Sequence, residues 1–169
     1  MSLRDIFKCF SNSENKRLKI VENNLVQNSI RNDSKSCLTI IQENPSINLK
    51  RALFYAAVHN NTETLILFIK HGADIDNGAL YHSSRLGNFE AVSALLSAGA
   101  NPNTGNSLSV AVGNGHSKVT SKLLAYGADS SLVTNHSIEH ATKNGYSETL
   151  EILSDWKIKY NIPPRTLYY

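Results

Sequence analysis

The chain has 169 residues, of which 41% are apolar, and this length is typical of one domain with a sizeable buried core. Its formal net charge is only +3 and its basic residues are scattered, so we expect no nucleic-acid binding. The two cysteines, Cys9 and Cys37, lack metal-ligand spacing, which predicts free thiols in a reducing compartment. The longest apolar run, Leu65 to Ile69, is far shorter than the roughly 20 residues of a membrane span.

Residues 1–15 form an amphipathic segment. Leu3, Ile6, Phe7 and Phe10 recur at the spacing of one helical face, with basic residues among the polar positions. A helix that lies on a membrane surface or against a partner is one interpretation. We prefer another, in which the segment packs over the exposed end of the following fold and the chain breaks at residues 11–15. Interfacial helices are usually longer and more basic.

Residues 16–49 contain two stretches with apolar residues at near-helical spacing, at 16–30 and 34–43. Asn44-Pro45 ends the second stretch, because the residue before a proline is disfavoured in a helix. The sequence therefore predicts two helices here.

Residues 50–157 repeat one pattern four times, at 50–77, 78–105, 106–134 and 135–157. Steps of 27, 28 and 30 residues relate four aligned positions, which are Ala56, Ser83, Ala111 and Ala141. Each copy divides into two short apolar-patterned helices. The first three copies close sixteen residues further on with Gly72, Gly99 and Gly127, whereas the fourth has Lys157. One helical hairpin cannot bury its apolar face alone, so this period predicts a solenoid in which neighbouring copies share a core.

At these residues the chain resembles the ankyrin-repeat family, whose pattern of about 33 residues reads T-P-L-H-x-A-A-x-x-G-H-x-E-V-V-x-L-L-L-x-x-G-A-D. The positions of the first copy that match it are Leu53, Ala56, Ala57, Glu63, Leu65, Phe68, Ile69, Gly72, Ala73 and Asp74. Thr-Pro is absent from every copy. The segment that forms the family's β-hairpin finger is shortened. The short period is similar to that of truncated ankyrin repeats in giant viruses and in microbes that live inside amoebae.

The resemblance implies an all-α, ankyrin-like solenoid of stacked helix-turn-helix repeats with little or no β-structure. Residues 16–49 are then a degenerate N-terminal capping repeat, because a bare end of such a stack would expose apolar surface. The last helix lacks the closing glycine and forms the other cap, and residues 158–169 are a tail.

The family's first helices line a concave surface that touches the partner. Carried over by position, the candidate partner-binding residues are Tyr55, His59, His82, Arg85, Asn114, His140 and Lys143. Tyr and Arg often anchor interfaces, because each offers a large contact area together with directional hydrogen bonds.

No catalytic constellation accompanies these residues. The run from Gly113 to Ser117 lacks the preceding strand of a phosphate-binding loop, and we interpret it as the turn between two helices. His82 and His140 lie two repeats apart, which at the usual helix spacing is about 20 Å and too far to share a metal. We therefore expect no enzymatic activity, no metal and no cofactor.

The sequence thus predicts a non-enzymatic protein–protein interaction module that binds a protein partner through its concave face. We expect a monomer in the cytoplasm, or in a host cell's cytoplasm if the source is a virus or an intracellular microbe. One alternative is a substrate of a modifying enzyme such as an asparaginyl hydroxylase, with Asn103 as the target and Leu95 eight residues before it. Another is a secreted effector or regulatory subunit that acts by binding. Tyr168 and Tyr169 are a further candidate motif for a partner.

Overall fold

The structure is a computed structural model that describes residues 3–75 and 78–160, with side chains from residue 14 onward. Within these ranges the chain forms ten α-helices and two short 3-10 turns, and it contains no β-strand. The all-α fold predicted from the sequence is confirmed.

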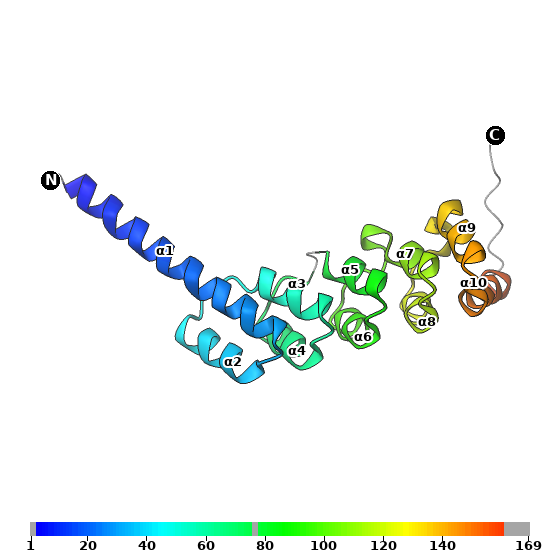
Figure 1. Cartoon of the computed structure of the whole chain (residues 1–169), viewed down its shortest axis with the longest axis horizontal. Helices are drawn as coiled ribbons and strands as arrows, with labels where there is room; N and C mark the ends of the chain where they lie inside the picture. The colour runs from blue at the N-terminus through cyan, green and yellow to red at the C-terminus, as the bar shows by residue number, and fades with distance from the viewer. Residues whose placement is uncertain (1–2, 76–77, 161–169) are drawn as a thin grey trace.

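The helices alternate between two layers (Figure 1). The first layer contains α1 (Leu3–Ile30), α3 (Lys50–Val58), α5 (Ala79–Leu86), α7 (Ser107–Gly113) and α9 (Asn135–Lys143). The second layer contains α2 (Ser34–Glu43), α4 (Thr62–Lys70), α6 (Phe89–Ser97), α8 (Ser117–Ala125) and α10 (Ser147–Lys159). The 3-10 turns, Thr104–Asn106 and Ser130–Leu132, precede α7 and α9. Each helix packs on its hairpin partner and on the next helix of its own layer, which makes an elongated stack.

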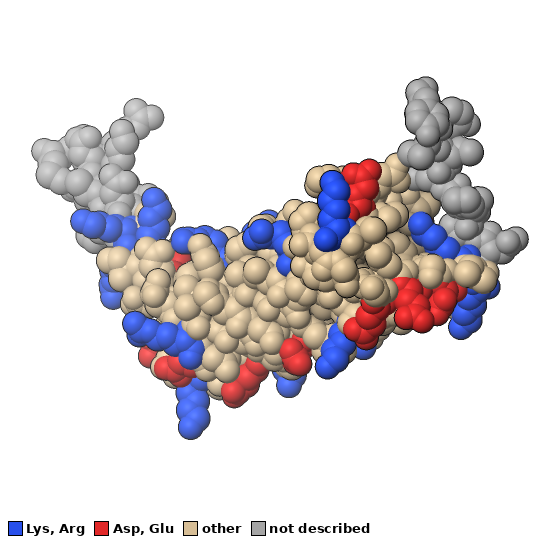
Figure 2. All heavy atoms as spheres, turned by 45° about the vertical axis from the view of Figure 1, so that its right-hand side comes forward, with Lys and Arg blue, Asp and Glu red and all other residues tan. Residues whose placement is uncertain are grey.

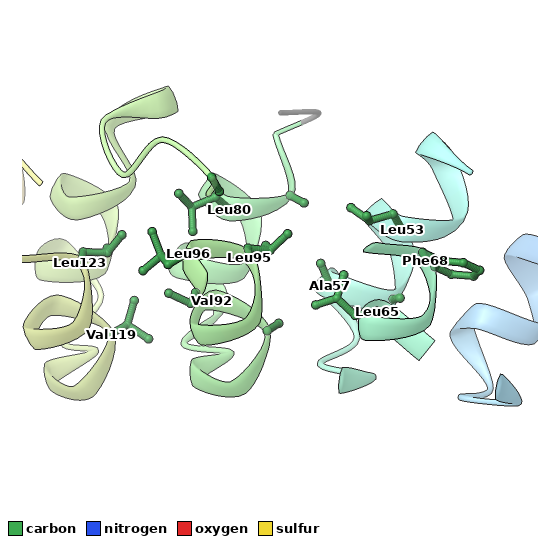
Figure 3. Close-up of a cluster of buried hydrophobic side chains, with 14 of the residues drawn as sticks. Leu53, Ala57, Leu65, Phe68, Leu80, Val92, Leu95, Leu96, Val119 and Leu123 are labelled. Atoms are coloured by element: carbon green, nitrogen blue, oxygen red, sulfur yellow. The ribbon is translucent and has the colours of Figure 1, made fainter. Parts of the chain in front are cut away.

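The core runs between the two layers as one cluster from Leu25 of α1 to Leu153 of α10 (Figure 3). Leu53 of the first layer and Phe68 and Leu95 of the second have no exposed surface. Burial of one such side chain stabilises the fold by about 1.5–3 kcal/mol, and helices of the same hairpin and of the neighbouring hairpin both pack around this core. The stack is therefore held together by contacts between repeats as much as by contacts within them.

A residue with positive φ separates the two helices of every hairpin. These residues are Asn32, Asn60, Gly87, Gly115 and Gly145, with φ values between 56° and 75°. The next residue caps the second helix and sits beside the preceding hairpin. Asn61 Nδ2 donates to the Ser29 and Ile30 carbonyls, at 2.7 and 2.8 Å.

The same bonds recur along the stack. Asn88 Nδ2 donates to the Ala57 and Val58 carbonyls, at 3.1 and 2.7 Å, and His116 Nε2 donates to the Arg85 carbonyl at 3.0 Å. The last carbonyls of a helix have no partner inside that helix. Each hairpin therefore satisfies the exposed end of the first helix before it.

The size of this cap side chain determines which residue fits the turn of the preceding hairpin. A Cβ atom at Gly87 would lie 2.5 Å from His116 Nδ1, and one at Gly115 would lie 2.5 Å from Tyr146 Cγ. The turn residue is an asparagine where the cap of the next hairpin is smaller. Asn32 is followed by the hairpin with the cap Asn61, and Asn60 by the hairpin with the cap Asn88. A Cβ atom at Gly145, in the last hairpin, would meet nothing within 4 Å.

We therefore expect Gly87→Asn and Gly115→Asn to lower the free energy of unfolding by about 1–3 kcal/mol each, because the new Cβ displaces a packed ring. Asparagine tolerates positive φ, so the backbone itself is not the cause. The control, Gly145→Asn, should cost much less. Urea unfolding followed by circular dichroism measures all three, and equal losses would refute the steric explanation.

Three buried hydroxyl groups in the described part of the chain have no hydrogen-bond partner, and one of them is Ser130 Oγ in the second 3-10 turn. The other two are Ser84 Oγ on α5 and Thr120 Oγ1 on α8, and both of these side chains have no exposed surface. The neighbouring hairpins place Ala57 at the position of Ser84, and Val92 at that of Thr120. By contrast, Ser83 Oγ donates to the Ala57 carbonyl at 3.1 Å.

Ser84→Ala and Thr120→Val should be neutral or should raise the stability by up to about 1 kcal/mol, since an unpaired buried polar group is costly. Ser83→Ala should instead lower it by about 1 kcal/mol, because it removes one of the hydrogen bonds that the Ala57 carbonyl accepts. The melting temperatures of the three variants test this contrast. A loss of similar size in all three would show that the two hydroxyl groups are satisfied in solution.

The predicted break at residues 11–15 is wrong, because α1 is one helix from Leu3 to Ile30. Serine and asparagine within a helix cost only about 0.5 kcal/mol each, which is too little to end it. The segment also does not cover the stack. Residues 14–20 are all exposed, and in Figure 1 this half of α1 points away from the other helices.

The C-terminal tail begins slightly later than residue 158, since α10 continues to Lys159. Residues 161–169, including Tyr168 and Tyr169, lie outside the described residues. The repeat boundaries drawn from the sequence remain our interpretation.

Candidate functional site

A row of four rings crosses the first two full hairpins. Phe54 and Tyr55 come from α3, and Tyr81 and His82 come from α5. The ring centroids of Phe54 and Tyr55 are 5.6 Å apart, while those of Phe54–His82 and Tyr81–His82 are 5.1 Å apart, all edge to face. Each such contact contributes about 0.5–1.5 kcal/mol beyond burial. This aromatic row, Tyr55–Phe54–His82–Tyr81, is half-buried and fixed in place across two repeats.

Exposed residues end the two helices that carry the row. His59 caps the C-terminus of α3, and Arg85 and Leu86 form the last turn of α5. All three side chains are exposed, and Leu86 keeps 46% of its surface accessible. The structure thus brings Tyr55 and His82 together through Phe54, with His59 and Arg85 at the ends of the same helices.

The other three candidate residues lie further along the first layer. Asn114 caps α7, where its Nδ2 donates to the Val110 carbonyl at 2.8 Å. His140 Nδ1 donates to the Gly113 carbonyl at 2.8 Å, which joins α9 to the end of α7. Lys143 is exposed in the last turn of α9, where its charge suits the helix dipole. Asn114 and His140 therefore have structural bonds of their own.

A hollow of about 400 Å³, with a lining that is part apolar and part polar, continues the surface beyond the aromatic row. Tyr81 lines it, together with Ser109 of α7 and with Thr134 and Ser137 at the start of α9. Ser109 Oγ lies 3.2 Å from Thr134 Oγ1 and 2.9 Å from Ser137 Oγ, and the latter two oxygens are 3.0 Å apart. Because Tyr81 belongs to both, the aromatic row and the hollow form one surface, called below the first-helix face.

Sequence reasoning missed Phe54, Tyr81 and the hydroxyl groups around the hollow. Phe54, Tyr81 and Ser109 stand at the position where the family pattern has histidine. This departure from the family pattern was the sequence signal that could have identified these residues as part of the site.

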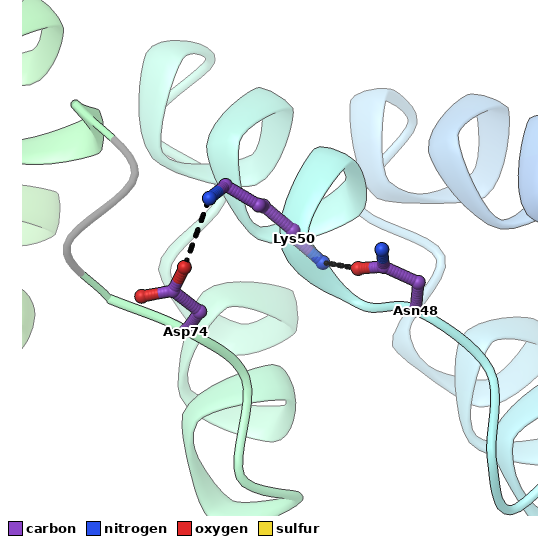
Figure 4. Close-up of polar contacts among 3 residues, drawn as sticks. All are labelled: Asn48, Lys50 and Asp74. Atoms are coloured by element: carbon purple, nitrogen blue, oxygen red, sulfur yellow. Dashed lines mark hydrogen bonds and ion pairs between the residues drawn. The ribbon is translucent and has the colours of Figure 1, made fainter.

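The shortened fingers leave short loops between hairpins. Lys50 Nζ lies 3.0 Å from Asp74 Oδ2, and the Lys50 backbone N–H donates to Asn48 Oδ1 at 2.9 Å (Figure 4). Both charged side chains are more than half exposed, so this ion pair contributes at most about 1 kcal/mol. Asn103 lies in a later loop, where its Oδ1 accepts from the Asp129 backbone N–H at 2.8 Å. Its role as a modification target stays a prediction.

The groups with a shifted pKa lie at helix ends and in the core. A hydrogen bond from Asn60 holds the pKa of Glu90 below its ordinary value, and bonds from Ser36 do the same for Asp33. Burial, together with the charge of Asp33, raises the pKa of the Cys37 thiol to about 12. The described residues contain no group of three or more His, Cys, Asp or Glu side chains that could hold a metal ion.

Cys37 should behave as an inert core residue, because it is fully buried and remains protonated at pH 8. In a Cys9→Ser variant, which leaves Cys37 as the one thiol, a thiol reagent should react at least about a hundredfold more slowly than with free cysteine. Urea should restore fast reaction at the midpoint of unfolding. Fast labelling of the native protein would contradict the buried position of Cys37.

Residues 13–106 match a family model described as ankyrin repeats, in three copies. The match spans more than half of the chain, which belongs to the ankyrin-repeat family. A search of curated proteins found no match. Ankyrin repeats are in general protein–protein interaction modules, and the family is typically non-catalytic. Every helix in the described residues is too short or too polar to cross a membrane.

Proposed function

We propose that the chain binds a protein partner through the first-helix face. The observation that carries this proposal is the aromatic row, which spans two repeats and continues through Tyr81 into the hollow. Rigid aromatic side chains provide contact area at little entropic cost, which is why interfaces are enriched in them. A surface that is already ordered in the free protein also avoids the cost of ordering it on binding.

The two halves of the face suit different parts of a partner. The rings of Tyr55 and His82, with the exposed side chain of Leu86, offer an apolar contact, and Arg85 beside them offers a bidentate donor. The half-buried hydroxyl groups of Thr134 and Ser137 at the hollow offer hydrogen bonds to the partner. Asn114 and His140 hold the ends of α7 and α9 in place, while His59 and Lys143 lie at the rim.

This assignment predicts that binding depends on the first layer of helices and not on the second. Arg85→Ala and Tyr55→Ala should each weaken the complex by about 1–2 kcal/mol. The controls are Lys70→Ala on α4 and Lys118→Ala on α8, two exposed charges of the second layer that should change affinity by less than about 0.5 kcal/mol.

The partner is obtained by affinity capture with the wild-type chain and identified by mass spectrometry, and the four variants are then titrated against it. Tyr55→Ala also removes the ring contact with Phe54, so its melting temperature is measured alongside. Loss of binding in the α4 and α8 variants, with binding intact in the α3 and α5 variants, would refute the assignment.

A further inference from the structure

The N-terminal half of α1 is a helix outside the stack. Residues 14–20 are all exposed, and the first buried side chain of the described residues is Leu25. The helix begins at Leu3, so at 1.5 Å per residue roughly 27 Å of it precedes Val21. Figure 1 shows this half pointing away from α2 and α3.

The net charge of the chain resides in this segment. Residues 1–20 contain five basic residues and two acidic ones, whereas residues 21–169 contain twelve of each. The basic residues are Arg4, Lys8, Lys16, Arg17 and Lys19. In Figure 2, Lys and Arg side chains gather where α1 leaves the stack. The stack itself is formally neutral, so the protruding helix is the cationic part of the molecule.

The register of the continuous helix separates apolar from basic positions. At 100° per residue, Leu3, Ile6, Phe7 and Phe10 share one side of α1, and Lys8 and Lys19 fall on the opposite side. Glu14 and Arg17 interrupt the apolar side one turn later. Beyond them, Leu18 and Ile20 are 44% and 54% exposed. The apolar face is therefore concentrated in the first three turns.

We propose that the N-terminal half of α1 binds the surface of a membrane that contains anionic lipids, with the Leu3–Phe10 face inserted and the basic residues at the headgroups. Large apolar residues opposite lysines are the pattern of interfacial helices, and anionic headgroups attract nearby Lys and Arg side chains. Pairing with a second copy is disfavoured, since both helices carry the same positive charge and the uninterrupted apolar face spans only eight residues. An apolar face of this kind also has no role against a nucleic-acid backbone.

The rigid continuation of α1 into the stack gives the binding a structural consequence. The helix enters the first layer at Val21 and packs on α3, so a membrane-bound α1 would hold the first-helix face close to the bilayer without covering it. The chain would then recruit its protein partner to a membrane surface.

Co-sedimentation of the full chain with vesicles tests the proposal. Vesicles with about 30% phosphatidylserine should bind at least tenfold more protein than pure phosphatidylcholine vesicles, and about 0.5 M salt should remove most of this binding. Phe7→Ser with Phe10→Ser, and separately Lys16→Glu with Lys19→Glu, should each reduce binding at least tenfold with little change in melting temperature, because these residues lie outside the stack. The matched control, Lys157→Glu with Lys159→Glu at the other end, should bind as the wild type does.

Two results would overturn the proposal. One is the absence of binding to phosphatidylserine vesicles at low salt. The other is binding that survives the α1 substitutions but is lost in the α10 control. Capture of the chain on immobilised polyglutamate without any vesicle binding would assign the cationic helix to an acidic protein instead, which also refutes a membrane role.

Discussion

The stack depends on one repeated polar contact, in which the cap of the second helix in each of the three middle hairpins bonds carbonyls at the end of the preceding first helix. Asn61 and Asn88 make it with two bonds each, and His116 makes it with one. Apolar burial drives the hairpins together but is nearly indifferent to their register. The directional bonds fix that register. The Asn88 bonds to the end of α3 join the two hairpins across which Phe54 contacts His82, so the caps help to align the candidate site.

The two ends of the described stack are closed by different kinds of side chain. At the N-terminal end, α1 and α2 present a polar hollow that Asn24, Gln27, Asn28 and Arg31 line. Amide and guanidinium groups there remain hydrated, so the surface does not invite another hairpin. At the other end, Trp156 and Tyr160 of α10 and its C-cap pack with ring centroids 4.6 Å apart, and Lys159 lies over the Tyr160 ring. Ring packing there takes the place of a following repeat.

Periodicity predicted the repeating helices because the fold itself is periodic. Gly99 and Gly127 adopt positive φ where the pattern requires the second helix to end. The predictions that failed, or were never made, concern features that occur once in the chain and do not repeat. The continuity of α1 depends on the helix propensity of several residues together, so no single signal around Ser11 revealed it. The contact between Phe54 and His82 joins neighbouring repeats, and a one-dimensional alignment places these residues in different columns.

The dependence of each turn residue on the next cap makes the order of repeats directional. A turn built on Gly87 or Gly115 has room for any cap, from asparagine to a tyrosine ring, whereas a turn built on Asn32 or Asn60 accommodates only a small one. A duplicated hairpin of the glycine kind can thus be followed by either type. A hairpin with asparagine in its turn can be inserted only before a hairpin whose second helix is capped by asparagine.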